Sequence, residues 1–269
     1  MGLPRNATGL ASFPEMYERC IVGPLFRPWA DLALDEVKLA PGDRLVDIAC
    51  GTGIVARVAR ERMGNGATVV GIDLSRDMLA VARRVAPDID WRKGHAAALP
   101  LVADERFDVV VCQQGLQFFP DKAAAAMEMR RAVAPGGRLA VATWRPDAEI
   151  PFLRELRAVA ERHVGAIADQ RHSFGDGTAL EALLRAAGFQ DVRSRTVSLP
   201  IRFEADAQYE RLNAMALVGM SAAGKSMSAQ ERLRAVDTIA TDSASVLARY
   251  AEGKAIAFEI SSNLATALG

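Results

Sequence analysis

The feature that most constrains the fold is a short apolar run that ends in a glycine turn, Leu45 to Gly53, with the sequence Leu-Val-Asp-Ile-Ala-Cys-Gly-Thr-Gly. Residues 44–48 have the length and β-branched content of a buried strand, and residues 54–63 repeat apolar side chains at helical spacing. Glycine accepts positive φ and lets the backbone approach a ligand, and the following helix N-terminus offers unpaired N–H groups. Two interpretations are open: the turn binds a nucleotide-like ligand, or it only reverses the direction of the chain.

A second apolar segment, residues 69–73, decides between these two possibilities. It ends in Asp73, which lies 22 positions after Gly51. The next parallel strand of a βαβ unit places a carboxylate there, where it can accept both hydroxyls of a ribose. Each charge-assisted hydrogen bond of this kind is worth about 1.5–3 kcal/mol. Asp73 could instead only cap a helix that begins near Ser75, but the two signals together favour a nucleoside site.

Strand and helix patterns alternate regularly along the chain. The predicted strands are 44–48, 68–72, 89–93, 107–112, 138–143, 192–199 and 255–261, and the predicted helices are 54–63, 75–85, 121–133, 152–164 and 178–187, with further helices between 204 and 252. This alternation predicts a doubly wound α/β fold with a mostly parallel sheet, whose ligand lies at the carboxyl ends of the strands. The helices between 204 and 252 are interpreted as an insertion between the last two strands.

The N-terminal region is predicted to form two helices, 13–22 and 25–37, separated by the helix breakers Gly23 and Pro24. Aromatic residues make up only 6% of the chain, so their concentration here is notable. The aromatic residues in question are Phe13, Tyr17, Phe26 and Trp29. They pack the helices onto the sheet edge, or they form a lid that closes over the ligand and excludes water.

Length and composition favour a globular α/β protein and give no indication of a nucleic-acid, membrane or metal partner. With 269 residues, half of them hydrophobic, the chain can form one large α/β domain with an elaborated cap. Lys+Arg and Asp+Glu number 33 each, so no nucleic-acid or membrane partner is indicated. Cys20, Cys50 and Cys112 lack metal-ligand spacing, and we expect no metal site. Without an apolar leader or a run of about 18 apolar residues, we expect a soluble, cytoplasmic protein.

Several motifs follow one another in order between residues 40 and 145. They are Val46–Gly53, Val70–Ser75, Gly94-His95-Ala96 with Leu99-Pro100, Phe107–Val110 and Pro135–Gly137. Together they resemble the class I S-adenosylmethionine-dependent methyltransferases, in the branch that includes the ubiquinone/menaquinone-type and other small-molecule enzymes. The resemblance implies S-adenosyl-L-methionine as cofactor, S-adenosyl-L-homocysteine as product, and transfer of a methyl group to a small molecule.

The resemblance also implies a Rossmann-like, seven-stranded sheet in which the sixth and seventh strands pair at the edge, the seventh being antiparallel. Residues 40–145 would form the cofactor-binding core and residues 1–39 the N-terminal helices or lid. Residues 146–269 would complete the sheet and add a helical cap, at 146–175 and 204–252, over the acceptor. Met215, Met220 and Met227 in that cap could line an apolar pocket, pack on the domain or form a homodimer contact.

The resemblance assigns cofactor contacts to matched positions. They are Asp47, Gly51, Gly53 and Gln113 for the methionine part, Asp73 for the ribose, Leu74 and Met78 for the adenine faces, and His95 and Ala96 for the adenine edge. His95 departs from the aspartate usual in the family. A neutral imidazole nitrogen can accept a hydrogen bond from the adenine amino group, whereas a protonated one cannot. The candidate acceptor-binding residues are Tyr17, Gln114, Gln117 and Trp144.

Methyl transfer from a sulfonium is an in-line displacement with a neutral leaving group, so the main tasks are alignment and exclusion of water. A general base is needed only where the acceptor loses its proton in or before the transfer. Gln117 and two phenylalanines stand where many relatives carry histidines, so we expect catalysis mainly by proximity and desolvation. The candidate catalytic residues are His172, His163 and Gln117, the histidines as possible bases. The expected acceptor is small and fairly hydrophobic.

Three other interpretations compete. Gly51 to Ala56 also fits the G-x-G-x-x-A motif of an NAD(P)-dependent oxidoreductase, but Asp47 and the Gly94–Pro100 segment speak against it. Gly219 to Ser226 matches a phosphate-binding loop, yet that motif needs a preceding strand, so we expect a flexible loop before a helix with a capping box at Ser228. The third is a non-catalytic, regulatory S-adenosylmethionine-binding protein.

Overall fold

The computed structural model describes residues 12–204 and 208–269. The chain divides into two compact units. Unit 1 comprises the described parts of residues 1–25, 146–170 and 198–260, and unit 2 comprises residues 26–145, 171–197 and 261–269. Within the described ranges, no helix has the length and apolar character needed to span a bilayer. The same residues contain no group of three or more His, Cys, Asp or Glu side chains placed to hold a metal ion.

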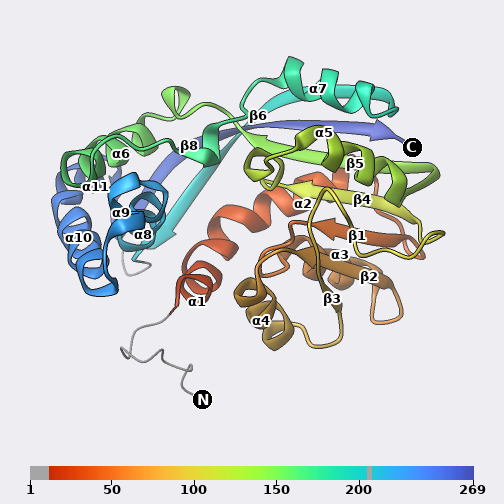
Figure 1. The fold of residues 1–269 in the computed structure, drawn as a ribbon, viewed down its shortest axis with the longest axis horizontal. Coiled ribbons are helices and arrows are strands. Elements are labelled where there is room, and N and C mark those ends of the chain that lie inside the picture. The colour runs from red at the N-terminus through yellow and green to blue at the C-terminus, as the bar shows by residue number, and fades with distance from the viewer. Residues whose placement is uncertain (1–11, 205–207) are drawn as a thin grey trace. The chain divides into compact units, whose positions relative to one another are not determined.

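The strands form one mixed sheet in the order β3-β2-β1-β4-β5-β8-β6, with the short strand β7 paired to β8 (Figure 1). Their bounds are β1 Arg44–Ile48, β2 Thr68–Asp73, β3 Asp90–Lys93, β4 Phe107–Gln113, β5 Val133–Trp144, β6 Gln190–Glu204, β7 Ala251–Glu252 and β8 Ala255–Leu268. Strands β1 to β5 pair in parallel, and β8 runs antiparallel to β5. The predicted doubly wound sheet with an antiparallel last strand is confirmed, and β7 adds an eighth, two-residue strand.

Among the described residues, five α-helices belong to unit 2. They are α2 Arg27–Glu36, α3 Ile54–Met63, α4 Arg76–Val85, α5 Lys122–Ala132 and α7 Gly177–Ala186. Three of them, α4, α5 and α7, begin at a capping side chain. Ser75 Oγ accepts the Met78 N–H at 3.2 Å and Asp121 Oδ1 accepts the Ala124 N–H at 2.8 Å, which satisfies donors that a helix start leaves open. Central strand β4 is buried along most of its length, so the carboxyl ends of β1, β2 and β4 are held rigidly at one edge of the sheet.

The predicted break at Gly23-Pro24 is wrong. The chain stays helical through α1 Phe13–Tyr17, a π-helical stretch η1 Glu18–Phe26 and α2. A π-helix bonds each N–H five residues back, so its wider turn accommodates Pro24, which lacks an N–H. The Trp29 ring lies 5.5 Å from that of Trp144, and Phe26 lies 6.1 Å from it, so these two aromatics pack within unit 2.

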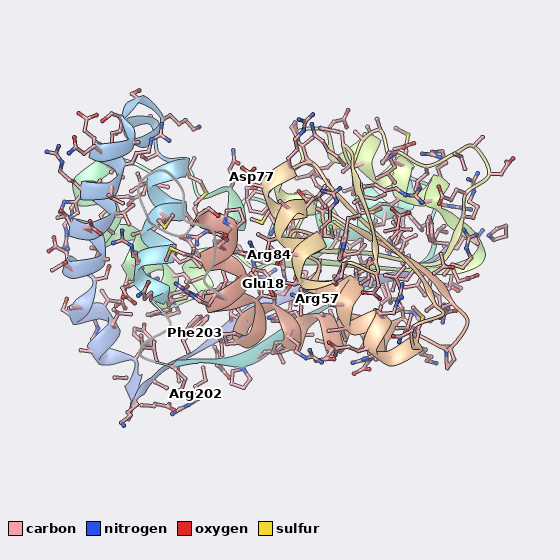
Figure 2. The ribbon with its side chains drawn as sticks, turned by 90° about the horizontal axis from the view of Figure 1, so that it is seen from below. Glu18, Arg57, Asp77, Arg84, Arg202 and Phe203 are labelled. Carbon is pink, nitrogen blue, oxygen red and sulfur yellow. The ribbon has the colours of Figure 1, made fainter. Side chains whose placement is uncertain are left out.

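Unit 1 has its own aromatic core. Its helices, besides α1, are α6 Pro151–Val164, α8 Tyr209–Met220, α9 Ala222–Ser226, α10 Ala229–Asp242 and α11 Ala244–Arg249. The Phe152, Tyr209 and Phe258 rings lie within 4.3–6.2 Å of one another. On β6, Phe203 is fully buried while the neighbouring Arg202 is exposed and pairs with Glu252, as the alternation of a strand requires (Figure 2).

The segment that resembles a phosphate-binding loop is helical, so the expectation of a flexible loop is wrong. Ser221 caps α9 by accepting the Gly224 N–H at 2.9 Å. Gly224 is required for packing, because a Cβ there would lie 1.9 Å from the Val218 carbonyl oxygen. Helix α8, and not a strand, lies immediately before this segment, so its N–H groups are not arranged as a phosphate-binding loop. The predicted capping box at Ser228 and Glu231 is confirmed.

Candidate cofactor site

The two motifs that the sequence singled out meet at the carboxyl ends of β1 and β2. The Gly51 N–H donates to Asp73 Oδ2 at 2.8 Å, and the Ser75 N–H donates to Asp73 Oδ1 at 2.7 Å. Burial raises the pKa of Asp73 above its ordinary value, against the lowering effect of these backbone hydrogen bonds. Each carboxylate oxygen has two lone pairs, so Asp73 retains the capacity to accept two hydroxyl groups.

The Trp91 ring packs against Gly53 of the glycine turn and against Gly71, a contact that the sequence analysis did not predict. In the sheet register Trp91 lies opposite Gly71. A Cβ on Gly53 would lie 2.1 Å from the Trp91 ring, and a Cβ on Gly71 would lie 2.2 Å from it. The indole N–H donates to the Ala86 carbonyl at 2.8 Å, which fixes the ring. Both glycines are thus needed because Trp91 occupies the space of their side chains, and Gly53 also has φ of +89°.

Asp47 is a buried carboxyl with one unpartnered oxygen. Its Oδ2 accepts the Ala56 N–H at 3.3 Å, at the first turn of α3. Its Oδ1 is buried and has no hydrogen-bond partner among the described residues. Burial, together with the nearby charge of Asp73, raises the pKa of Asp47 to about 7. The site therefore holds a carboxyl whose pKa lies near neutral pH and which has no cationic partner among the described residues.

Three buried glutamines follow one another where β4 ends. Gln113 Nε2 donates to the Phe26 carbonyl, Gln114 Nε2 to Ser262 Oγ and Gln117 Nε2 to the Gln114 carbonyl, each at 3.0 Å. Their exposed fractions are only 8%, 6% and 3%. All three Oε1 atoms are buried without a partner in the part of the chain that the structure describes. The amide oxygens, like Asp47 Oδ1, are acceptors that still require donors.

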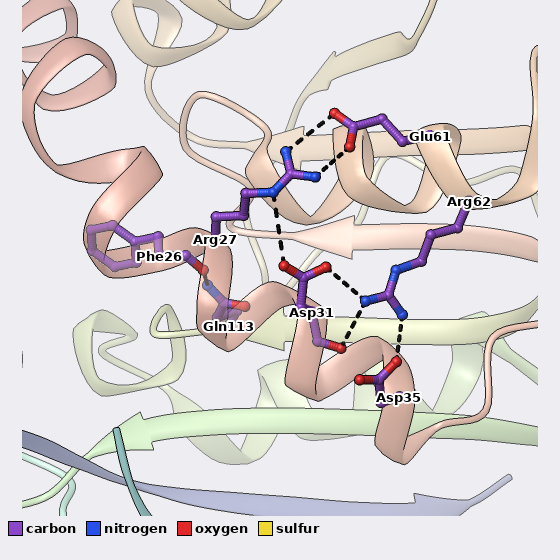
Figure 3. Close-up of polar contacts among 7 residues, drawn as sticks. All are labelled: Phe26, Arg27, Asp31, Asp35, Glu61, Arg62 and Gln113. Carbon is purple, nitrogen blue, oxygen red and sulfur yellow. Dashed lines mark hydrogen bonds and ion pairs between the residues drawn. The ribbon is translucent and has the colours of Figure 1, made fainter. Parts of the chain in front are cut away.

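An ion-pair network holds α2 against α3 and so positions the Phe26 carbonyl that Gln113 contacts (Figure 3). Arg27 pairs in bidentate fashion with Glu61, at 2.5 and 3.3 Å. Arg62 pairs with Asp31 at 2.7 Å and with Asp35 at 2.6 Å. These side chains are largely exposed, so each pair contributes at most about 1 kcal/mol, and their effect is mainly one of geometry.

The residues predicted to contact adenine lie after β2 and β3. Leu74, directly after Asp73, is 59% exposed, which is unusual for a leucine, and Met78 is half-buried on α4. His95 is exposed, and its Nδ1 accepts the Ala97 N–H at 3.1 Å. In the neutral ring the proton then sits on Nε2, which can donate a hydrogen bond but cannot accept one. The predicted contact of His95 with the adenine edge stays a prediction.

The residues predicted to bind the methyl acceptor or to take part in catalysis are distributed over both units. Trp144 is buried by its contacts with Phe26 and Trp29. His172 belongs to unit 2, where its Nδ1 lies 2.7 Å from the Arg145 carbonyl oxygen. Tyr17 and His163 belong to unit 1, and His163 Nε2 lies 2.8 Å from Asp242 Oδ2. Unit 2 thus contains every predicted cofactor residue.

Comparison with known proteins identifies this sheet unit. Residues 46–141 match the family described as "Methyltransferase domain". A demethylmenaquinone methyltransferase of Renibacterium salmoninarum is 33% identical in a region that covers 64% of this chain and 77% of the relative's own length. The chain belongs to the class I S-adenosylmethionine-dependent methyltransferases. A nocamycin O-methyltransferase of Saccharothrix syringae is 35% identical over 66% of this methyltransferase and 70% of its own length.

The fold agrees with this assignment. The YcgJ protein of Bacillus subtilis superposes with a TM-score of 0.57 over 89% of this chain and 97% of its own, at 18% identity. The methyl donor is S-adenosylmethionine, and the chain is an enzyme. The alternatives of an NAD(P)-dependent oxidoreductase and of a non-catalytic binding protein are therefore set aside.

A test of the Trp91 contact follows from the geometry of Gly71. Gly71 has no positive φ, so an alanine there is blocked mainly by the Trp91 ring, at 2.2 Å, with Cys50 Sγ farther away at 3.1 Å. We expect Gly71→Ala to weaken S-adenosylhomocysteine binding by about tenfold or more, because the turn must shift. The double variant Gly71→Ala/Trp91→Leu should recover most of this loss. Calorimetric titration of the four proteins of the cycle measures the coupling, and additive effects would contradict it.

Proposed function

We propose that this methyltransferase transfers the methyl group of S-adenosylmethionine to a small, fairly hydrophobic molecule by in-line displacement, with its cofactor at the carboxyl ends of β1, β2 and β4. The observation that carries the proposal is the direct bond between the glycine turn and Asp73, the Gly51 N–H to Oδ2 contact of 2.8 Å. The names of two relatives, a nocamycin and a demethylmenaquinone methyltransferase, support a small-molecule acceptor. The predicted lid at 1–39, cap at 146–175 and 204–252, and homodimer stay predictions.

The unpartnered acceptors of the site support this cofactor. S-adenosylmethionine presents an α-ammonium group and two ribose hydroxyls, all of them donors. Asp73 would hold the ribose, while Asp47 and Gln113, each with a buried oxygen that lacks a partner among the described residues, would face the methionine part. Gly51 and Gly53 would let the backbone approach, as their positive φ values of +58° and +89° permit.

The adenine would lie beyond the ribose. Leu74 and Met78 would flank its faces, which accounts for the exposure of Leu74. Ala96, which is 9% exposed, would lie at the adenine edge beside His95. The His95 Nε2–H would then donate to a ring nitrogen of adenine, in place of the acceptor that an aspartate provides.

The cofactor supplies an electrophilic methyl group on a cationic sulfur. The residues of this chain would bind the two reactants, align them and exclude water. His172 is the histidine placed beside the glutamine segment, since its neighbour Ser173 donates to the Gln117 carbonyl at 3.1 Å. Its Nδ1 carries the proton toward the Arg145 carbonyl, so Nε2 is its basic nitrogen.

If catalysis rests mainly on proximity and desolvation, removal of His172 should have a small effect. We expect His172→Ala to retain kcat within about fivefold of the wild type, since loss of a true general base costs about 100-fold or more. The measurement is the pH profile of kcat for both proteins, with His163→Ala as the matched control. An activity that disappears in His172→Ala, with cofactor binding intact, would show that the enzyme uses a base.

The proposed function itself is tested by binding. The purified protein is titrated with S-adenosylhomocysteine and, separately, with NAD, and both the heat of binding and the melting temperature are followed. A ligand that prefers the folded state raises the melting temperature. We expect micromolar affinity for S-adenosylhomocysteine and no response to NAD. Binding of NAD in preference, or of neither, would contradict the proposed site.

A further inference from the structure

The three glutamines at the end of β4 are oriented by their partners. The Phe26 and Gln114 carbonyl oxygens can only accept, so the groups that face them must be the NH2 groups of Gln113 and Gln117. Ser262 Oγ gives its hydrogen to the Thr143 carbonyl at 2.8 Å, so it accepts from Gln114 Nε2. The oxygen of each amide is therefore the end that is left without a partner, and this does not depend on a choice between two amide orientations.

These oxygens lie on one short stretch at the carboxyl edge of the sheet, where doubly wound folds bind their ligands. Gln113 ends β4, Gln114 has φ of +55° and Gln117 lies in the 3₁₀ turn Leu116–Phe118. Each of the three NH2 groups donates one hydrogen to an acceptor within the protein, whereas each amide oxygen has no partner among the described residues. The stretch consequently offers hydrogen-bond acceptors and carries no charge.

Residues 113–121 contain no cationic side chain. Lys122, the next cation along the chain, donates to the Phe119 carbonyl at 2.9 Å and lies over the Phe174 ring. A carboxylate or phosphate placed against the amide oxygens would meet partial negative charge without a donor. A hydroxyl or N–H group would satisfy an acceptor that burial has removed from water.

We propose that Gln114 and Gln117 select acceptor molecules that carry a neutral hydrogen-bond donor, a hydroxyl or an N–H group, and reject carboxylates and phosphates of the same shape. This rests on the proposed function, since it concerns the acceptor side of the same site. Gln113, whose amide is anchored on the Phe26 carbonyl, is assigned to the methionine part of the cofactor. The two glutamines are specificity residues. An amide oxygen is too weak a base to take a proton from the acceptor.

The test uses the protein saturated with S-adenosylhomocysteine and two matched sets of probes. They are 1-naphthol, 1-methoxynaphthalene and 1-naphthoate, and phenol, anisole and benzoate. At about pH 7.5 the hydroxyl compounds are neutral and the carboxylates are charged. We expect at least one hydroxyl compound to bind at least about tenfold more tightly than its methyl ether and its carboxylate, because a site built around a hydroxyl rejects analogues that lack it.

The variants Gln117→Met and Gln114→Met keep the side-chain volume and remove the amide. In each we expect the preference for the hydroxyl compound to fall to within about threefold, with affinity for S-adenosylhomocysteine retained as evidence of folding. Gln190→Met, at an exposed position that begins β6, is the matched control and should keep the wild-type preference.

The possible failures are distinguishable. If the wild type binds S-adenosylhomocysteine but prefers a carboxylate or an ether, binds none of the hydroxyl compounds, or keeps its preference in Gln117→Met, the inference about the glutamines is wrong and the proposed function stands. If the wild type does not bind S-adenosylhomocysteine at all, the proposed function fails and the inference fails with it.

Discussion

Replacement of Asp47 by asparagine is expected to stabilise the cofactor-free protein at pH 8 by about 2–3 kcal/mol and to weaken cofactor binding at the same pH. Asp47 is 1% exposed, and its pKa is raised to about 7 by burial and by the charge of Asp73. A pKa that is higher in the folded state than in the unfolded chain means that folding favours the neutral form of Asp47 over the ionised form. The stability contributed by neutral Asp47 is fully present below its ordinary pKa of 3.8 and is lost as pH rises through about 7.

This prediction is tested by measuring the free energy of unfolding at a pH below 7 and at a pH above 7. Urea unfolding of the wild type and of Asp47→Asn at about pH 5 and pH 8 should show a fall in the free energy of unfolding for the wild type, and a smaller fall for the variant. A pKa of about 7 in place of 3.8 corresponds to about 4 kcal/mol at most, from which the unpartnered NH2 group of asparagine subtracts about 1–2 kcal/mol. An equal fall in both proteins would contradict the assignment of the buried charge to Asp47.

The same carboxyl predicts how cofactor affinity depends on pH. A cationic group of the cofactor near Asp47 would favour the ionised form, so affinity should rise as pH increases through about 7 and then level off. In Asp47→Asn the affinity should be weaker and nearly independent of pH over this range. The buried Asp47 carboxylate would thus destabilise the cofactor-free enzyme, and it would become paired with the cationic group when the cofactor binds.

Local sequence signals predicted the part of the fold that carries the site. The bounds of β1 and α3 agree with the predicted 44–48 and 54–63, because strand, glycine turn and helix are each encoded by neighbouring residues. The helix predicted at 75–85 is likewise present as α4, Arg76–Val85, and Ser75 caps it. The mostly parallel sheet with its antiparallel last strand followed from the alternation and from the family resemblance, and such a sheet brings Asp73 to Gly51.

What the sequence did not reveal depends on contacts between distant residues. Trp91 fills the space beside Gly53 and Gly71. A strand of four residues is too short for its hydrophobic periodicity to predict such a contact. The helix through Pro24 required a π-helical stretch, and β8 extends to Leu268 because it pairs along the whole of Arg138–Trp144. The orientations of the glutamine amides depend on partners such as Phe26, 87 positions away from Gln113.

Loss of the Asp73 side chain is expected to have the largest effect on cofactor binding. Asp73 is the acceptor for the Gly51 and Ser75 N–H groups and the proposed acceptor for the ribose hydroxyls, so Asp73→Ala removes ligand contacts and the anchor of the glycine turn together. We expect the affinity for S-adenosylhomocysteine to fall by about tenfold at least, and by about 100-fold if two charge-assisted bonds are lost. The matched control Asp104→Ala removes a carboxylate from an exposed loop position and should bind as the wild type does.

Asp73→Asn separates the two roles of the residue. Asparagine keeps one carbonyl oxygen for a backbone N–H but turns its NH2 group toward the other donor, so one of the Gly51 and Ser75 contacts is lost. It should also lower the pKa of Asp47, because the charge of Asp73 is one of the causes that raise it. We therefore expect Asp73→Asn to move the pH dependence of cofactor affinity to lower pH, besides weakening binding. An unchanged midpoint would show that the two carboxyls act independently and that burial alone sets the ionisation of Asp47.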